Sequence, residues 1–333
     1  MGITLGVYTI ETEVDLSHLN KGIKDVKGKV RKAFNDIDAD MKQGFKQRLG
    51  MNAADAALAA GQAVVEFTQQ SMEEFKAFEK GASEVFTLLG DQATDTFKNQ
   101  MERDVLSFGQ SVGRTSDEVL PALYQSISAG VPTDNVFDFM QIASDAALGG
   151  VTTLETAVDG ITSVVNAYGA ETVDAAAASD IMFTAVKLGK TDFEQLSASL
   201  FNVVPTAASL GVTFEDVAAS MAALTAQGTP TSVATTQMRQ AFIEASKSGT
   251  KLDKAIKDLT GQSFAELIAS GQTSSQIFMN LRNSMPEQEF KDLFGSVEAM
   301  NAVLGLTNDT ASDVIGSFTD VEGATAAAAE TMK

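Results

Sequence analysis

The chain has 333 residues, 44% of them hydrophobic and 20% charged, which is typical of a folded chain with one large or two ordinary domains. Its 24 Lys and Arg residues against 44 Asp and Glu residues give a formal net charge of −20, which disfavours generic binding to nucleic acid or to anionic lipid surfaces. The absence of cysteine and the single histidine exclude disulfides, thiolate zinc sites, cysteine nucleophiles and two-histidine metal sites within one chain.

The start of the chain lacks the basic segment of a secretory signal. No stretch reaches the ~18 consecutive apolar residues of a spanning helix. The sequence therefore predicts a chain without a membrane span that is made and kept in the cytoplasm.

Residues 1–80 are predicted to form a helical arm. Residues 1–50 hold nine Lys and Arg against seven Asp and Glu, a net charge of +2 in an otherwise acidic chain. Apolar residues follow the 4-3-4-3-4 spacing of a heptad seam at Leu19, Ile23, Val26, Val30, Ala33 and Ile37. This seam indicates a coiled coil through which copies self-associate, but its glycines and short length equally fit an amphipathic arm lying on its own domain.

Residues 81–250 are predicted to form a compact, acidic, multi-helix core. Apolar residues recur at helical spacing, as at Leu154, Val158, Ile161, Val165 and Tyr168. No alternating apolar run is bounded by an Asn-Gly or Asp-Gly hairpin turn. The fold class is therefore predicted to be all-α, and residues 251–333 are predicted to be a helical extension.

A hydroxyl three residues before a carboxylate marks several predicted helix starts. Such pairs can form a capping box, in which each side chain binds a backbone N–H at the helix start. The pairs are Thr115 with Glu118, Thr152 with Glu155, Thr191 with Glu194, Thr213 with Asp216, and Ser263 with Glu266. Helix capping therefore accounts for part of the acidity.

The segment around Gly149 and Gly150 is echoed around Gly189 and again around Gly211. The spacings from Gly150 to Gly189 and on to Gly211 are 39 and 22 residues, and this inequality argues against a strict solenoid. We interpret the echo as a reused way of starting a helix, with duplication left open.

Three short patterns could bind a ligand or act on one. Gly189-Lys190-Thr191 matches the end of a phosphate-binding loop, but the earlier glycine of that loop is replaced by Thr184. Asp36, Asp38 and Asp40 match the first ligands of a calcium-binding EF-hand loop, yet Met41 and Gln47 replace its glycine and its final glutamate. His18 has Ser17 and Asp15 nearby, but nothing in the sequence around it indicates the cleft that a catalytic triad requires.

Neighbouring carboxylates are the remaining candidates. Asp117 with Glu118, and Glu215 with Asp216, could serve as a glycosidase acid and base if burial raised one pKa. Both pairs sit at helix starts, where capping explains them. We therefore predict no catalytic, metal-binding or cofactor-binding residue, and no enzyme activity.

A series of motifs between about Phe75 and Phe242 resembles the core domain of phage tail tape-measure (minor tail) proteins. The motifs occur in the same order and spacing: Phe78-Glu79-Lys80; Leu106-Ser107; Glu118; Ala122 to Val131; Thr191 to Leu196; Val204 to Ala208; Gly211 to Ala219; Ala222 to Leu224; Gly228; Ala234 to Thr236; and Met238-Arg239. A looser match, from Gly261 to Leu267 and from Leu293 to Ala299, extends the resemblance to about two thirds of the chain.

This resemblance implies a structural virion protein, assembled in the host cytoplasm and located in the lumen of the tail tube. It would set tail length, template tube assembly and leave during genome ejection. Its implied partners are the tail tube protein, tail-assembly chaperones and proteins of the tail tip or baseplate. The family is not defined by a catalytic residue, so none is transferred.

The chain is short for such a protein, and Gly and Pro interrupt its helices too often for a rod. One unbroken helix of this length would span about 500 Å, so we expect that the core is not itself the ruler. The final Gly323 to Glu330 has no helix C-cap, which indicates an N-terminal piece of a longer protein. The alternatives are a phage-associated cell-wall hydrolase and a cytoplasmic helical adaptor unrelated to phage.

Overall fold

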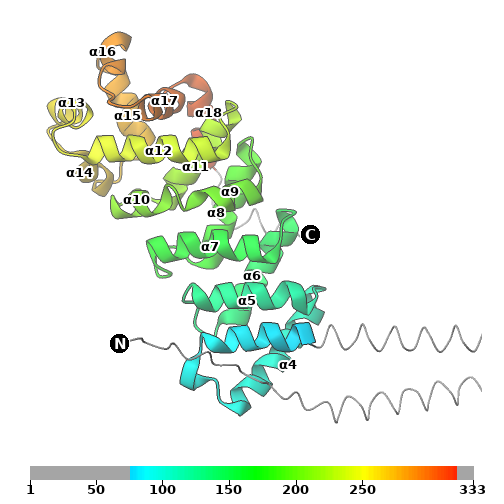
Figure 1. Ribbon diagram of the computed structural model, residues 1–333. Helices are drawn as coiled ribbons and strands as arrows, with labels where there is room; N and C mark the ends of the chain where they lie inside the picture. The colour runs from blue at the N-terminus through cyan, green and yellow to red at the C-terminus, as the bar shows by residue number, and fades with distance from the viewer. Residues whose placement is uncertain (1–75, 321–333) are drawn as a thin grey trace, which may run out of the picture. The chain divides into compact units, whose positions relative to one another are not determined.

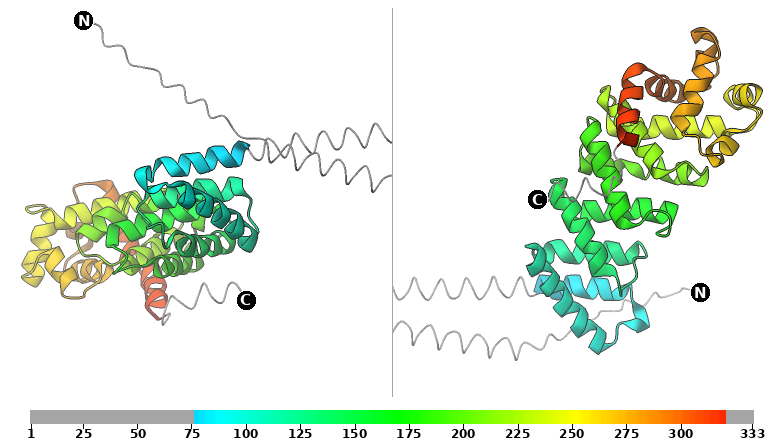
Figure 2. Two further views of the ribbon diagram at one scale, coloured as in Figure 1. Left: turned by 90° about the horizontal axis from the view of Figure 1, so that it is seen from below. Right: turned by 180° about the vertical axis from the view of Figure 1, so that it is seen from behind.

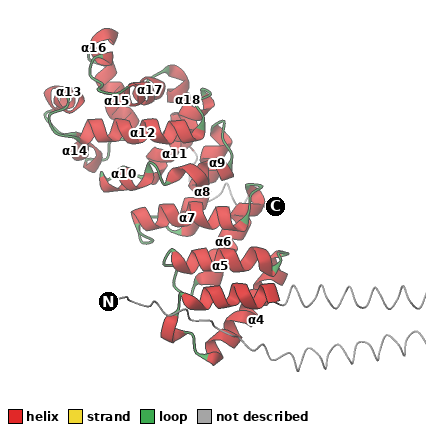
Figure 3. Ribbon diagram, in the orientation of Figure 1, coloured by secondary structure: helices red, strands yellow, loops and turns green. Residues whose placement is uncertain are grey.

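The computed structural model describes residues 76–320, with side chains to residue 318. Within this range all regular structure is helical and there is no strand, which confirms the all-α prediction (Figure 3). Contacts place residues 80–320 in one compact unit. The heptad seam, His18 and the Asp36 to Asp40 pattern lie outside the described residues, so the predicted arm and its self-association stay predictions.

The first described element is a helix over residues 76–87. The elements that follow are η1 (Gly90–Gln92), α4 (Asp95–Val112), α5 (Ser116–Ser128), α6 (Val136–Gly149), α7 (Leu154–Tyr168), α8 (Ala175–Leu188), α9 (Phe193–Leu200), α10 (Val204–Ser209), α11 (Phe214–Ala226), α12 (Thr231–Ser246), α13 (Lys251–Thr260), α14 (Phe264–Ala269), α15 (Ser274–Asn283), α16 (Glu287–Lys291), α17 (Val297–Leu306) and α18 (Asp309–Asp320).

The helices of this unit stack in two layers. The first layer, which faces the viewer in Figure 1, holds α5, α7, α9 with α10, and α12, each packed on the next. The second layer holds α4, α6, α8 and α11, and is seen from its own side in the rear view of Figure 2. From α4 to α12, with α9 and α10 counted together, successive helices alternate between the layers, so the stack consists of helical hairpins.

The hairpins repeat at a nearly constant interval. Second-layer helices begin at Asp95, Val136, Ala175 and Phe214, which are 41, 39 and 39 residues apart. First-layer helices begin at Ser116, Leu154, Phe193 and Thr231, which are 38, 39 and 38 residues apart. This is the arrangement of an α-solenoid, in which each hairpin contacts mainly its neighbours.

The sequence argument against a solenoid was therefore wrong. Gly150 and Gly189 both lie in turns from the second layer to the first, and their spacing of 39 is the repeat. Gly211 lies in a turn from the first layer back to the second. The spacing of 22 compares two different kinds of turn and carries no information about the repeat.

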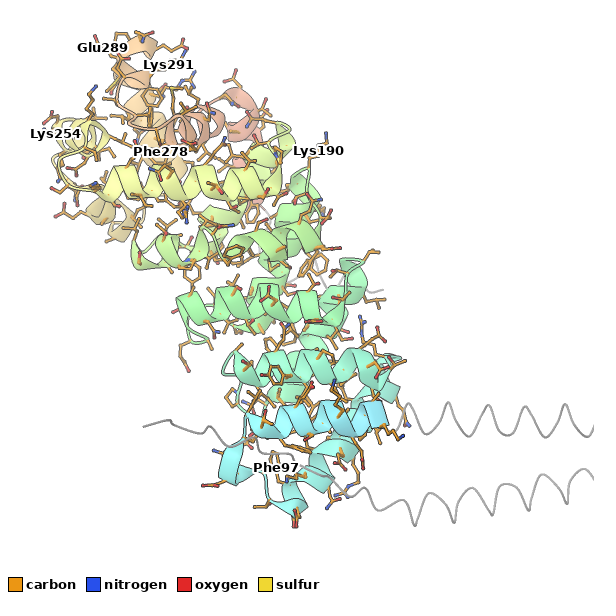
Figure 4. The ribbon with its side chains drawn as sticks, in the orientation of Figure 1. Phe97, Lys190, Lys254, Phe278, Glu289 and Lys291 are labelled. Atoms are coloured by element: carbon orange, nitrogen blue, oxygen red, sulfur yellow. The ribbon has the colours of Figure 1, made fainter. Side chains whose placement is uncertain are left out.

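The C-terminal helices close the stack. Helices α13 to α16 leave it, and the chain then returns so that α17 packs on α12 and α18 packs on α11. Helices from both sides of residue 250 thus pack together, and the domain division expected there stays a prediction. Phe278 lies in the interior between these helices, whereas Lys254, Glu289 and Lys291 lie on the outside (Figure 4).

The observed helix starts agree with some of the predicted capping pairs and differ from others. Capping boxes form at Thr115 with Glu118 and at Ser263 with Glu266, as expected. At the two starts predicted at Thr152 and Thr191, the N-cap lies one residue later, at Thr153 and Asp192. That register buries the next residue, Leu154 or Phe193, so core packing overrode the sequence pattern.

Candidate functional site

The buried carboxylate of Asp216 links two helix starts. Asp216 lies in the first turn of α11, where its N–H donates to the Thr213 hydroxyl. The capping pattern predicted that its carboxylate accepts from the Thr213 N–H, but this hydrogen bond does not form. The carboxylate accepts instead from the Ser274 N–H at 2.6 Å and the Ser274 hydroxyl at 3.0 Å, at the first residue of α15.

The same arrangement occurs one helix later. Glu244 of α12 is buried, and its carboxylate accepts from the Gly295 N–H at 2.8 Å and the Ser296 hydroxyl at 2.6 Å. Ser296 is the N-cap of α17. An anionic group at a helix N-terminus is stabilised by the free N–H groups and the helix dipole. Asp216 and Glu244 therefore fasten the starts of α15 and α17 to the stack.

Tyr168 completes the polar cluster around Asp216. Its hydroxyl donates to the Val212 carbonyl at 2.9 Å. Burial raises the pKa of Tyr168 far above its usual value, and the negative charges of Asp216 and Glu215 raise it further. Burial also raises the pKa of Asp216, against the lowering effect of the bonds from Ser274. Tyr168 is therefore a neutral hydrogen-bond donor in this interior.

The predicted carboxylate pairs do not form acid–base sites. Glu215 is exposed while Asp216 is buried against Ser274, so the two groups do not face a common cleft. In the other pair, the Thr115 N–H bound to Glu118 is the main cause that lowers the pKa of this carboxyl. A glycosidase acid needs the opposite shift.

Gly189 of the phosphate-loop pattern has a packing role. A Cβ at this position would lie 3.0 Å from the Ala222 Cα of α11, so glycine allows α8 and α11 to approach. Gly189 is the C-cap of α8, and the hydroxyl of Thr191 lies 2.7 Å from that of Thr231. The pattern is therefore a tight turn between α8 and α9.

A groove of about 730 Å³ lies beside the end of α7 and the start of α8. Its polar lining includes Asn166, which donates to the Ala129 carbonyl, and Asp174, which caps α8. These groups are thus engaged within the fold. Among residues 76–320 there is no cluster of three or more His, Asp or Glu that could hold a metal ion, and no helix long and apolar enough to cross a membrane.

The roles of Asp216 and Glu244 were missed in the sequence. Their partners are 58 and 51 residues away, beyond the reach of any local pattern. The available signal was Glu244 itself, a lone acid beside Ala241, Phe242 and Ala245 on an apolar helix face. An acid in such a position needs a buried partner.

Comparisons with known proteins agree with the resemblance in the motifs. The family model for phage-related minor tail proteins matches residues 102–332. A probable tape measure protein of Clostridium phage phiCD119 is 32% identical over 243 residues, which cover 69% of this chain and 25% of the relative. The tape measure protein of Pneumococcus phage Dp-1 is 22% identical over 279 residues, covering 80% of this chain and 24% of the relative. The chain thus spans about a quarter of the length of either relative, and no solved structure matches.

Proposed function

Because the chain belongs to the family of phage-related minor tail proteins, we propose that it acts in a tape-measure protein, which sets tail length and templates assembly of the tail tube. The observation that carries this proposal is the 32% identity over 243 residues to a probable tape measure protein. The proposed location is the lumen of the tail tube, after assembly in the host cytoplasm, with release during genome ejection.

In this proposal the described unit provides a surface that contacts partner proteins. Its longest helix with defined ends is α4, with 18 residues, which corresponds to about 27 Å. A stack of such hairpins offers a broad folded surface, whereas a ruler needs length. We therefore assign the measuring role to the tape-measure protein as a whole. Its proposed partners are the tail tube protein, tail-assembly chaperones and tail-tip or baseplate proteins.

The acidity of the stack fits a protein that lies near DNA without binding it. From Thr115 to Met238 the chain has only Lys187 and Lys190 as basic residues, against fourteen acids. The resulting net charge of −12 repels the phosphate backbone. We expect duplex DNA beads not to retain the protein at low salt, and tight retention would contradict this part of the proposal.

We assign a structural role in place of catalysis. Support comes from Asp216 and Glu244, the buried acids whose carboxylates are both held by helix starts. The rival cell-wall hydrolase predicts a zone of lysis in a peptidoglycan gel that disappears when one acid is replaced. The cytoplasmic-adaptor alternative predicts a gene neighbourhood without tail tube and tail-assembly genes.

The decisive experiment removes the protein from the phage that encodes it. A nonsense mutation early in the gene should give particles without tails or tubes of irregular length, measured by negative-stain electron microscopy. The intact gene supplied in trans should restore tails of uniform length. Tails of normal length in the mutant, without complementation, would refute the proposal.

A further inference from the structure

The groove of about 730 Å³ lies at the edge of the stack where first-layer helices turn into second-layer helices. The start of α6, the end of α7 and the start of α8 line it, together with the turns that precede α6 and α8. Most of the lining is apolar, and it includes Val131, Phe139, Ile142 and Val165. Its volume and its apolar lining are those of a pocket for a small molecule.

Two carboxylates in the lining have oxygens that the fold does not use. Asp138, in the first turn of α6, is exposed and forms no salt bridge with any described residue. Asp174, the N-cap of α8, accepts from the Ala177 N–H through Oδ1 alone. No Lys, Arg or His occurs from Thr115 to Val186. The chain around the groove therefore supplies acids without a counter-charge.

A third carboxylate, that of Asp180, is buried beside the groove. Asp180 is 6% exposed, and within residues 76–320 its side chain forms no hydrogen bond or salt bridge. It follows the lining residue Ala176 by four positions and so lies on the same face of α8. Because helical side chains lean toward the N-terminus of their helix, the Asp180 carboxylate leans toward Ala176 and the groove.

The surroundings of Asp180 favour a cationic ligand. Burial raises the pKa of Asp180, and the negative charge of Asp174 raises it further. An unpaired buried carboxylate costs free energy, and a cation that binds it offsets that cost. The next base along α8 is Lys187, about 10 Å further on, and no salt bridge joins it to Asp180.

We propose that this groove binds a linear polyamine, whose ammonium groups pair with Asp138, Asp174 and Asp180 while its methylene chains lie on the apolar lining. Asp174 and Asp180 are six residues apart, about 9 Å along α8. A ligand that carries several charges along its length can reach both carboxylates. Methylene chains that end in an ammonium group pack on apolar surface, as lysine side chains do.

Spermidine is the probe for this site. The full chain is titrated by calorimetry at about 0.15 M salt, where attraction to distant surface acids is screened beyond about 8 Å. One spermidine should bind per chain and raise the thermal midpoint. Asp180→Asn should weaken the affinity about tenfold, because it removes a buried charge that binds the ligand. Asp138→Asn, at an exposed position, should weaken it about two- to fivefold.

Two further variants serve as controls. Glu194→Gln removes the same charge from an exposed residue at the start of α9, outside the groove, and should leave the affinity unchanged. Ala176→Phe fills the groove without a change in charge and should abolish binding. This variant and Asp138→Asn keep the test valid if Asp180→Asn misfolds, which far-UV circular dichroism detects.

The proposal is wrong if spermidine does not bind at this salt concentration. It is also wrong if Glu194→Gln weakens binding as much as Asp180→Asn, since the attraction would then be to the acidic chain as a whole. Binding of a lysine-containing peptide in place of spermidine would overturn it as well, and would assign the groove to a lysine side chain of a partner protein. None of these results depends on the tail-length function, which the nonsense mutation tests separately.

Discussion

Gly160 of α7 lies directly against Ser197 of α9. A Cβ on Gly160 would come within 2.6 Å of the Ser197 Cβ and 3.0 Å of its Cα. Such distances are shorter than any ordinary carbon contact, so the approach of these two first-layer helices depends on the missing side chain. The relationship fixes the spacing between two neighbouring hairpins of the stack.

Gly160→Ala is therefore expected to destabilise the stack by about 1–3 kcal/mol, because the added methyl group must push α7 away from α9. Urea denaturation followed by circular dichroism measures this change. Gly316→Ala in α18 is the matched control, since its Cβ would meet open space. There the higher helix propensity of alanine should stabilise the chain by up to about 1 kcal/mol. Equal effects of the two substitutions would contradict the close packing.

The link between Asp216 and Ser274 gives a second prediction. Asp216→Ala leaves the buried Ser274 N–H without an acceptor and should cost about 1–3 kcal/mol of unfolding free energy. Ser274→Ala removes only the hydroxyl bond and should cost about 1 kcal/mol. The double variant should lose less than the sum of the two, as measured in a thermodynamic cycle. The exposed neighbour Glu215→Ala serves as the control, and additive losses would show that the two residues act independently.

Two buried acids should contribute to the stability of the fold with opposite dependence on pH. The hydrogen bond from Lys257, with that from the Gly249 N–H, lowers the pKa of Asp253. Its stabilising effect is then present above about pH 4, the ordinary range of an aspartate, and is lost as the pH falls through the lowered value. The thermal midpoint of Asp253→Asn should lie below that of the wild type by a constant amount near neutral pH. This difference should shrink below about pH 4.

Asp216 shows the reverse sign because burial raises its pKa. Between the ordinary value near 4 and the raised value, the folded state binds the proton more tightly than the unfolded state. Lowering the pH through this window should therefore stabilise the wild type relative to Asp216→Asn. A parallel pH dependence of the two asparagine variants would contradict the difference in environment.

The turn between α6 and α7 contains a strained residue. Val151 has a φ of 52°, the left-handed region that β-branched residues disfavour, and its side chain is 90% exposed. Val151→Gly should remove the strain without losing packing and raise the unfolding free energy by about 1 kcal/mol. The same change at Val297, an exposed residue in the first turn of α17, should lower stability. Destabilisation at both positions would argue against strain at Val151.

The sequence could predict what depends on neighbours along the chain. Spacings such as Leu154, Val158 and Ile161 indicated buried helix faces, and all three residues are at most 1% exposed. The capping box at Thr115 was predictable for the same reason, since its partner Glu118 is three residues away. At Thr152 the pattern failed because the burial of Leu154, a tertiary effect, selected Thr153 as the cap.

The solenoid and the carboxylate links could not be found in this way. The repeat appears only when turns of the same kind are compared. The sequences around Gly150 and Gly211 are similar, but one turn leads from the second layer to the first and the other leads back. The partner of Glu244 is supplied by the return of α17, which depends on the path of α13 to α16. Such contacts follow from the assembled stack and leave no local periodicity.

The late return of α17 also determines the order in which the unit can fold. Hairpins such as α6–α7 and α8–α9 join helices that are adjacent in sequence, so they close short loops and form early. Glu244 must wait for Gly295, 51 residues further on, and the entropic cost of closing a loop grows with its length. On the ribosome, the hairpins are thus complete while Asp216 and Glu244 are still hydrated charges on an open edge. Until their partners are synthesised, the two carboxylates stay in water, so the closing of the stack by α15 and α17 comes last.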